Sequence, residues 1–211
     1  MDYSVYLFDF DYTLANAEVG IMMCYRAVLQ ANEHPDVPDD TIRRGIGYGI
    51  VEIFTRLTGI TDAETLERYK AEYLVASDEY MAENTVLYPY TVPVLTELRQ
   101  RGKKIGIIST KHRYRIMQSL TRFGIEDMFD IIIGAEDVTE LKPDPQGIML
   151  AAEKLGAQNC DILYTGDSIV DARTANNACV DFAAVMTGTT TRAEFVTLPR
   201  LMIMSDLSAL L

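Results

Sequence analysis

Residues 4–13 read SVYLFDFDYT, an apolar run that ends in two aspartates, Asp9 and Asp11, placed one residue apart. Four further runs of this kind lie at 104–108, 130–133, 161–164 and 181–186, and a weaker one lies at 201–204. The runs are nearly continuous rather than alternating, which is typical of strands covered on both faces. The segments 91–101, 113–123, 145–155 and 169–178 between the later runs read as helices. This alternation predicts an α/β fold with a parallel, doubly wound, Rossmann-like sheet.

The stretch from about residue 17 to residue 84 breaks this rhythm, because it holds no convincing strand and reads as several helices. One helix is expected over about 18–31. The last is expected to begin at Thr61, where Thr61 and Glu64 have the spacing of a capping box. We therefore predict an α/β core of residues 1–16 and 85–211, with a helical cap domain of residues 17–84 inserted after the first strand.

Composition and charge exclude several classes of protein. The 211 residues carry a net charge of −12 without a run of Lys and Arg, so no nucleic-acid partner is expected. No stretch reaches the ~18 apolar residues of a membrane helix, and the N-terminus does not resemble a signal peptide, so no membrane partner is expected. Three widely spaced cysteines indicate reduced thiols in the cytoplasm, and two histidines are too few for a typical zinc site. Monomer and homodimer both remain open.

Polar side chains follow four of the predicted strands. In an open α/β sheet, ligands bind beyond the carboxyl ends of the strands, so these side chains are expected to meet at one edge. They are Asp9 and Asp11 after the first run; Ser109, Thr110 and Lys111 after the second; Glu136, Asp137 and Lys142 after the third; and Asp167 and Asp171 after the fourth.

These residues resemble the haloacid dehalogenase superfamily over almost the whole chain. Its four motifs appear in order as Asp9-Phe-Asp11-Tyr-Thr13, Ser109, Lys142-Pro-Asp-Pro145 and Gly166-Asp167-Ser-Ile-Val-Asp171. The helical insertion is similar to the C1-type cap of the phosphoglycolate-phosphatase-like branch. An acid at Asp11 favours phosphatase over dehalogenase chemistry. The resemblance implies a Mg²⁺-dependent hydrolase of a small phosphorylated metabolite, such as a phosphoglycolate-like compound or a sugar phosphate.

The chemistry of phosphoryl transfer gives each residue an expected role. Asp9 would attack phosphorus and form an aspartyl-phosphate, while Asp11 would act as general acid and base. Mg²⁺ would be held by Asp9, the backbone carbonyl of Asp11, and Asp167, with Asp171 orienting these groups directly or through water. Ser109 and Lys142 would bind the phosphoryl oxygens, with Thr110 as a competing hydroxyl.

Several positions carry weaker expectations. Tyr12 stands where the superfamily usually has glycine, and it is expected either to pack under the cap or to narrow the pocket; Cys179 stands where an Ala-Gly pair often closes the fourth motif. Arg44, with Arg43 and Tyr48, belongs either to a specificity loop of the cap or to a solvated turn. Lys111 either assists the site or is a surface lysine. Glu136 and Asp137 are expected to be loop acids rather than metal ligands.

Three other functions share the same core residues. A β-phosphoglucomutase-like mutase usually carries a histidine soon after the first motif, and residues 15–28, ANAEVGIMMCYRAV, contain none. Hydrolysis of inorganic pyrophosphate uses the same chemistry. A non-catalytic binding module would have no reason to keep buried like charges together.

Overall fold

The computed structural model describes residues 3–211, which divide into two compact units. One unit comprises residues 3–16 and Leu87–Leu211, and the other comprises Ala17–Val86. Among the described residues, no helix is both long and apolar enough to cross a membrane.

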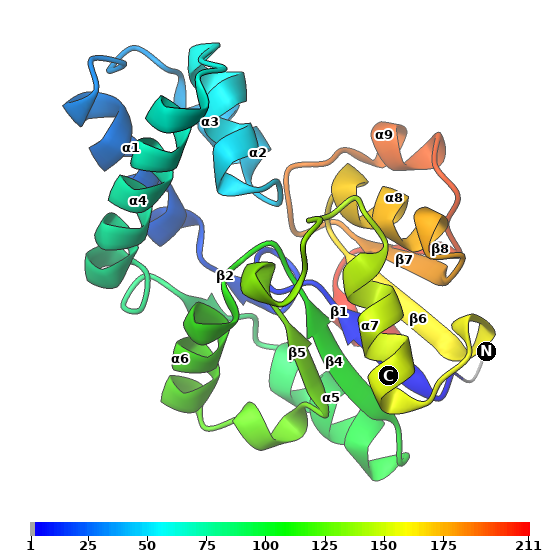
Figure 1. Ribbon diagram of the computed structural model, residues 1–211. Helices are drawn as coiled ribbons and strands as arrows, with labels where there is room; N and C mark the ends of the chain where they lie inside the picture. The colour runs from blue at the N-terminus through cyan, green and yellow to red at the C-terminus, as the bar shows by residue number, and fades with distance from the viewer. Residues whose placement is uncertain (1–2) are drawn as a thin grey trace. The chain divides into compact units, whose positions relative to one another are not determined.

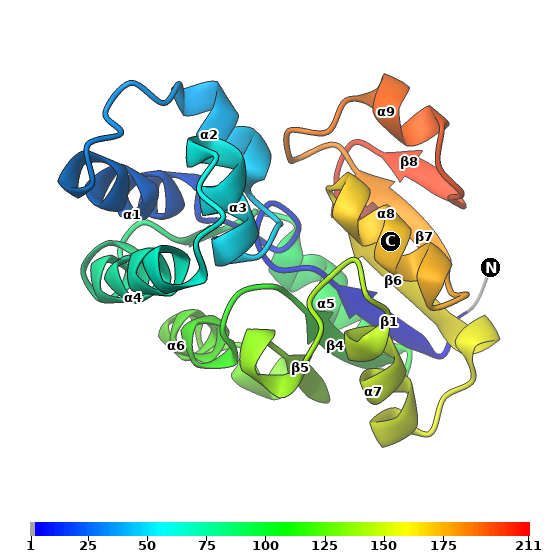
Figure 2. The same cartoon turned by 45° about the horizontal axis from the view of Figure 1, so that its top comes forward.

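The first unit is built on a six-stranded parallel sheet with the strand order β5-β4-β1-β6-β7-β8. Figure 2 shows β1 running between β4 and β6. The strands are β1 (Val5–Phe8), β4 (Lys104–Ile108), β5 (Ile131–Ile133), β6 (Ile162–Gly166), β7 (Asp181–Val185) and β8 (Met202–Met204). Two short strands, β2 (Ala15–Asn16) and β3 (Val86–Leu87), pair separately.

Helices cover both faces of this sheet because successive strand residues point to opposite sides. Phe8 packs in a cluster with Leu95 of α5, whereas Leu7 packs in a second cluster with Ile148 of α7. In Figure 1, α7 and α8 lie in front of the sheet. The helices are α5 (Thr91–Gln100), α6 (Arg113–Phe123), α7 (Gln146–Leu155), α8 (Ile169–Asn177) and α9 (Arg192–Val196), with single 3₁₀ turns η1 (Glu126–Met128), η2 (Ala135–Asp137), η3 (Asn159–Asp161) and η4 (Leu207–Leu210).

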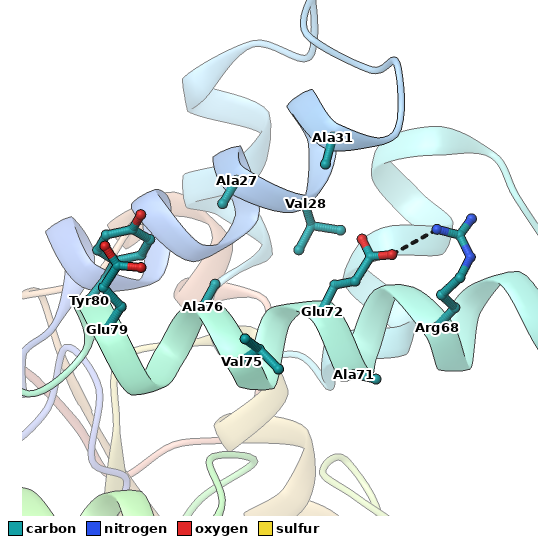
Figure 3. Close-up of a pocket in the computed structure, with 10 residues that line it drawn as sticks. All are labelled: Ala27, Val28, Ala31, Arg68, Ala71, Glu72, Val75, Ala76, Glu79 and Tyr80. Carbon is teal, nitrogen blue, oxygen red and sulfur yellow. Dashed lines mark hydrogen bonds and ion pairs between the residues drawn. The ribbon is translucent and has the colours of Figure 1, made fainter.

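The second unit is mainly helical. Its helices are α1 (Glu18–Ala31), α2 (Asp39–Gly45), α3 (Ile50–Thr58) and α4 (Ala63–Tyr80). Its core is aromatic: the ring of Tyr25 lies 5.1 Å from that of Phe54 and 4.6 Å from that of Tyr73. A groove of about 500 Å³ lies between α1 and α4. Val28 and Val75 are among the residues that line it (Figure 3).

The predicted fold class is confirmed, and most element bounds agree within two residues. The capping box expected at Thr61 is wrong. Helix α4 begins at Ala63, and Asp62 is the residue that caps it, accepting a hydrogen bond from the Thr65 N–H at 2.9 Å. Threonine and aspartate side chains can both cap a helix, so the residue type at position 61 did not fix where the helix begins.

Candidate active site

The candidate site lies at the carboxyl edge of the sheet. Asp9 follows β1, Ser109 follows β4 and Asp167 follows β6, and these three strands are neighbours. Backbone hydrogen bonds fix the strand ends: the Asp9 N–H donates to the Thr165 carbonyl at 2.9 Å, and the Ser109 N–H donates to the Ile133 carbonyl at 3.0 Å. Sheet order, rather than sequence proximity, therefore brings these side chains to one place.

Lys142 enters this edge from the loop after β5 as a buried cation. Its Nζ lies 2.9 Å from Asp9 Oδ1 and 2.6 Å from Asp171 Oδ1, and it donates to the Tyr164 hydroxyl at 3.2 Å. Burial lowers the pKa of Lys142, but the negative charges of Asp171 and Asp9 outweigh burial and raise it above its ordinary value. The ammonium is therefore a permanent positive charge among the acids.

Asp171 is held on both of its carboxylate oxygens. Oδ1 accepts from Lys142 and from the Tyr164 hydroxyl at 2.7 Å. Oδ2 accepts from the Ser168 N–H at 3.1 Å and from the Ser168 hydroxyl, completing a capping box at the start of α8. With four donors, Asp171 is fixed by protein contacts and is suited to orient Lys142. Sequence reasoning missed Tyr164, because it sits in an apolar strand without a polar pattern.

Asp9, Asp167 and Asp171 form a buried acidic group in which one oxygen from each lies within 4.8 Å of the others. Burial raises the pKa of Asp9 to about 7; Lys142 opposes this shift, and the charges of Asp171 and Asp11 add to it. Burial and the charges of Asp171 and Asp9 hold the pKa of Asp167 well above its ordinary value. Mutual repulsion of this kind is relieved by a divalent cation.

The donor set fits a hard cation such as Mg²⁺, which prefers carboxylate oxygens. Asp9 Oδ1 is buried and, apart from its ion pair with Lys142, has no aligned hydrogen-bond donor. Asp167 Oδ1 accepts one long hydrogen bond, from the Thr13 hydroxyl at 3.3 Å. These two carboxylates retain more capacity for a cation than Asp171 does.

Asp11 has a cation of its own. The Nζ of Lys111 lies 2.8 Å from Asp11 Oδ1 and 3.2 Å from Asp11 Oδ2. Both side chains are largely buried, with 8% of Lys111 and 13% of Asp11 exposed. Lys111 is thus part of the cluster and is not a solvated surface lysine. The two aspartates of the first motif therefore face different cations, Lys142 for Asp9 and Lys111 for Asp11.

The comparison with known proteins identifies the family. A sequence profile of haloacid dehalogenase-like hydrolases matches residues 6–185. The chain belongs to this family. It is 30% identical to pyrophosphatase PpaX of Listeria innocua, over 82% of this chain and 78% of that protein, and 26% identical to a phosphoglycolate phosphatase of Pasteurella multocida, over 81% and 80%. A solved haloacid dehalogenase-like structure from Bacteroides fragilis is 50% identical with a TM-score of 0.98, covering both chains completely. The protein is accordingly a phosphatase-type hydrolase of the superfamily.

The loop after the first strand explains one departure of this hydrolase from its superfamily. Tyr12 has a φ of 61°, in the left-handed region that favours glycine. Cys179 has a φ of 53°, in the same region. A glycine adopts such a backbone conformation without strain, which is a physical reason for the usual glycine after the second aspartate of the first motif.

Ser109 is buried and accepts a hydrogen bond from the Lys111 N–H at 3.3 Å, whereas Thr110 is half-buried beside it.

A loop that sequence reasoning missed also belongs to the site. It follows β7, where the Thr187 hydroxyl donates to the carbonyl of Tyr12. A Cβ atom added to Gly188 would lie only 1.8 Å from Asp167 Oδ2. The hydrolase thus needs a residue without a side chain at position 188 to seat the Asp167 carboxylate. The stretch Thr187-Gly-Thr-Thr190 carries no charged residue, so no chemical signal marked it in the sequence.

The acids after β5 have structural partners. Glu136 accepts hydrogen bonds from the N–H groups of Arg113 at 2.7 Å and Tyr114 at 3.3 Å, at the start of α6. Asp137 accepts from the Gly134 N–H at 2.9 Å. Both side chains satisfy backbone donors in the loop, as expected for loop acids.

The cap residues singled out in the sequence lie in the helical unit of the hydrolase. Arg44 is exposed at the end of α2. Arg43 pairs with Glu18 at 2.7 Å, and the Arg56 guanidinium lies 3.9 Å from the ring centre of Tyr48. Arg43 and Tyr48 therefore make contacts within their own unit.

Proposed function

We propose that this hydrolase is a Mg²⁺-dependent phosphomonoesterase that acts on a small phosphorylated metabolite through an aspartyl-phosphate on Asp9. The observation that carries the proposal is the buried cluster of Asp9, Asp167 and Asp171 around the Lys142 ammonium. Such a cluster is costly to bury, and it matches the demand of phosphoryl transfer for a nucleophile among fixed positive charges.

The first half-reaction forms a bond between an Asp9 carboxylate oxygen and phosphorus and breaks the bond between phosphorus and the leaving oxygen. Asp11 gives its proton to the leaving oxygen as that bond breaks. Lys142 and Ser109 hold the phosphoryl oxygens and offset the charge that develops on them. In the second half-reaction Asp11 takes a proton from water, the water oxygen bonds to phosphorus, and Asp9 is released as a carboxylate.

Asp9, Asp167 and the backbone carbonyl of Asp11 would hold Mg²⁺. When bound, the cation supplies Lewis-acid neutralisation of the phosphoryl charge. Asp171 has a positioning role: it accepts four hydrogen bonds that fix its carboxylate, and the carboxylate in turn orients the Lys142 ammonium. The Asp9 and Asp167 carboxylates accept fewer hydrogen bonds than Asp171 does, which leaves their oxygens available to the cation.

Two substrate classes come from the relatives. One relative is named a pyrophosphatase and another a phosphoglycolate phosphatase, and both activities need the same core residues. We include inorganic pyrophosphate beside small phosphomonoesters, sugar phosphates among them. The free cysteines Cys24, Cys160 and Cys179 fit the proposal that the protein works in the reducing cytoplasm.

Phosphate release from a panel of phosphorylated metabolites and pyrophosphate tests this function. The wild-type protein should release phosphate with Mg²⁺, and chelation should abolish release. Asp9→Asn should be inactive while it unfolds at the wild-type temperature. Near-normal release by Asp9→Asn would refute the nucleophile. Interconversion of sugar phosphates without release would indicate a mutase, and stabilisation by Mg²⁺ without any turnover would indicate a binding module.

A further inference from the structure

Lys111 is a largely buried cation that the mechanism above does not use. Its Nζ contacts both oxygens of Asp11, at 2.8 and 3.2 Å, and lies 5.4 Å from the centre of the Phe10 ring. A lysine ammonium is rarely buried unless it is paired with a negative charge, because burial removes its hydration. A net charge of −12 makes a local cation the means of holding any anionic group at this site.

The backbone of Lys111 is fixed by the phosphoryl-binding loop. Its N–H donates to the Ser109 hydroxyl at 3.3 Å, and its carbonyl accepts from the Ala135 N–H at 3.1 Å. The backbone from which the ammonium reaches Asp11 is therefore held by two hydrogen bonds. It has three donor protons, and Asp11 is one carboxylate, so the ammonium can engage a second anion without leaving Asp11.

The position of Asp11 places the leaving group beside this ammonium. A hydrogen bond from Asp11 to the leaving oxygen spans about 2.7 Å, and Lys111 Nζ lies 2.8 Å from Asp11 Oδ1. The leaving oxygen is thus within about 5.5 Å of Lys111 Nζ, from those two lengths. An anionic group attached next to the leaving oxygen is therefore close enough to turn toward the ammonium.

The geometry points to Lys111 as the residue that recognises a second negative charge on the leaving group. The favoured substrates are then phosphate esters or anhydrides whose leaving group is itself an anion, either a carboxylate or a phosphate. This inference rests on the proposed function, because it needs Asp11 to face the leaving oxygen. Neutral alcohol leaving groups offer Lys111 no partner, so they gain nothing from it.

Matched substrate pairs test the inference. Phosphoglycolate is compared with 2-hydroxyethyl phosphate for a carboxylate, and pyrophosphate with methyl phosphate for a phosphate. Each kcat/KM is measured in the wild type and in Lys111→Met. The ratio of anionic to neutral kcat/KM should fall about 10- to 100-fold in the variant for at least one pair, as expected for loss of a charged hydrogen bond. The pair that responds identifies the anion.

Lys104→Met is the matched control. Lys104 also pairs with an aspartate, Asp130, at 3.5 Å, but it lies at the start of β4, away from the carboxyl edge. Its anionic-to-neutral ratio should equal that of the wild type. Lys111→Arg retains the charge and serves if Lys111→Met does not fold; its ratio should stay within about threefold of the wild-type ratio.

The outcomes separate this inference from the proposed function. If Lys111→Met slows the anionic and neutral substrates of both pairs equally, Lys111 is only the counter-ion of Asp11 and the inference fails. The inference also fails if the ratio of anionic to neutral kcat/KM falls about 10-fold or more in Lys111→Arg, which keeps the positive charge. If the wild type releases no phosphate from any member, neutral esters included, the proposed function fails first.

Discussion

Gly188→Ala is expected to disable the site without disturbing the fold. Gly188 does not have a positive φ, so its backbone accepts alanine, and the effect is steric alone. The added Cβ would lie 1.8 Å from Asp167 Oδ2, whereas ordinary contact begins at 3.4 Å, so the two must separate by about 1.6 Å. The loop resists moving because the neighbouring Thr187 hydroxyl is bonded to the carbonyl of Tyr12. The Asp167 carboxylate therefore moves instead.

A displacement of about 1 Å at a reacting centre can cost on the order of 100-fold in rate. We therefore expect kcat for phosphate release to fall about 100-fold or more in Gly188→Ala, with a higher Mg²⁺ concentration needed for half-maximal rate. Urea unfolding without Mg²⁺ should change by less than about 1 kcal/mol, as for substitutions outside the core. Thr189→Ala, in the same loop, is the control and should keep wild-type kinetics. A Gly188→Ala variant within threefold of wild type at equal Mg²⁺ would refute the reasoning.

Three further predictions concern stability, each measured by urea unfolding. Tyr164→Phe removes a buried donor to Asp171 and should cost about 1–2 kcal/mol; an unchanged stability would show that the hydroxyl is dispensable. The pKa of Asp130 is lowered, since the Ile105 N–H and Arg99 outweigh its burial. The stabilisation by the Asp130 carboxylate is therefore present at pH 7 and is lost as the pH falls below the ordinary pKa of 3.8. The free energy of unfolding of the wild type should be higher than that of Asp130→Asn at pH 7, and the two values should converge in acid. A constant gap would contradict that linkage. Cys179→Gly should stabilise by up to about 1 kcal/mol, because it relieves a φ of 53°; a loss of stability would show that the cysteine makes a useful contact.

The fold could be predicted because its signals are local. Nearly continuous apolar runs mark buried strands, and the residue types that follow them, Asp9, Ser109, Lys142 and Asp167, mark the carboxyl edge. Once the strands are parallel, sheet order alone brings these side chains together. The chemistry of the residues therefore pointed to the same place as the topology.

The remaining features depend on contacts that no local pattern encodes. The pairing of Lys111 with Asp11 joins residues that are far apart in the chain, so the sequence left Lys111 undecided between site and surface. Gly188 is required because it lacks a Cβ next to the Asp167 carboxylate, and this close approach cannot be recognised from the sequence. The φ of 61° at Tyr12, which gives a backbone reason why glycine usually stands there, cannot be read from the residue type. Such features depend on tertiary geometry rather than on composition.

The most direct test of the mechanism is to trap the phosphoryl group on the protein. The enzyme is mixed with substrate and Mg²⁺, quenched in acid and digested, and the peptide containing Asp9 is analysed by mass spectrometry, with and without borohydride reduction. The mechanism predicts one added phosphoryl group on that peptide, and borohydride should reduce the aspartyl-phosphate at position 9 to homoserine with release of phosphate. Asp11→Asn lacks both the acid for forming the adduct and the base for its hydrolysis, so the adduct should form slowly and persist once formed. Rapid phosphate release without an adduct at Asp9 in either protein, or an adduct on another residue, would contradict it.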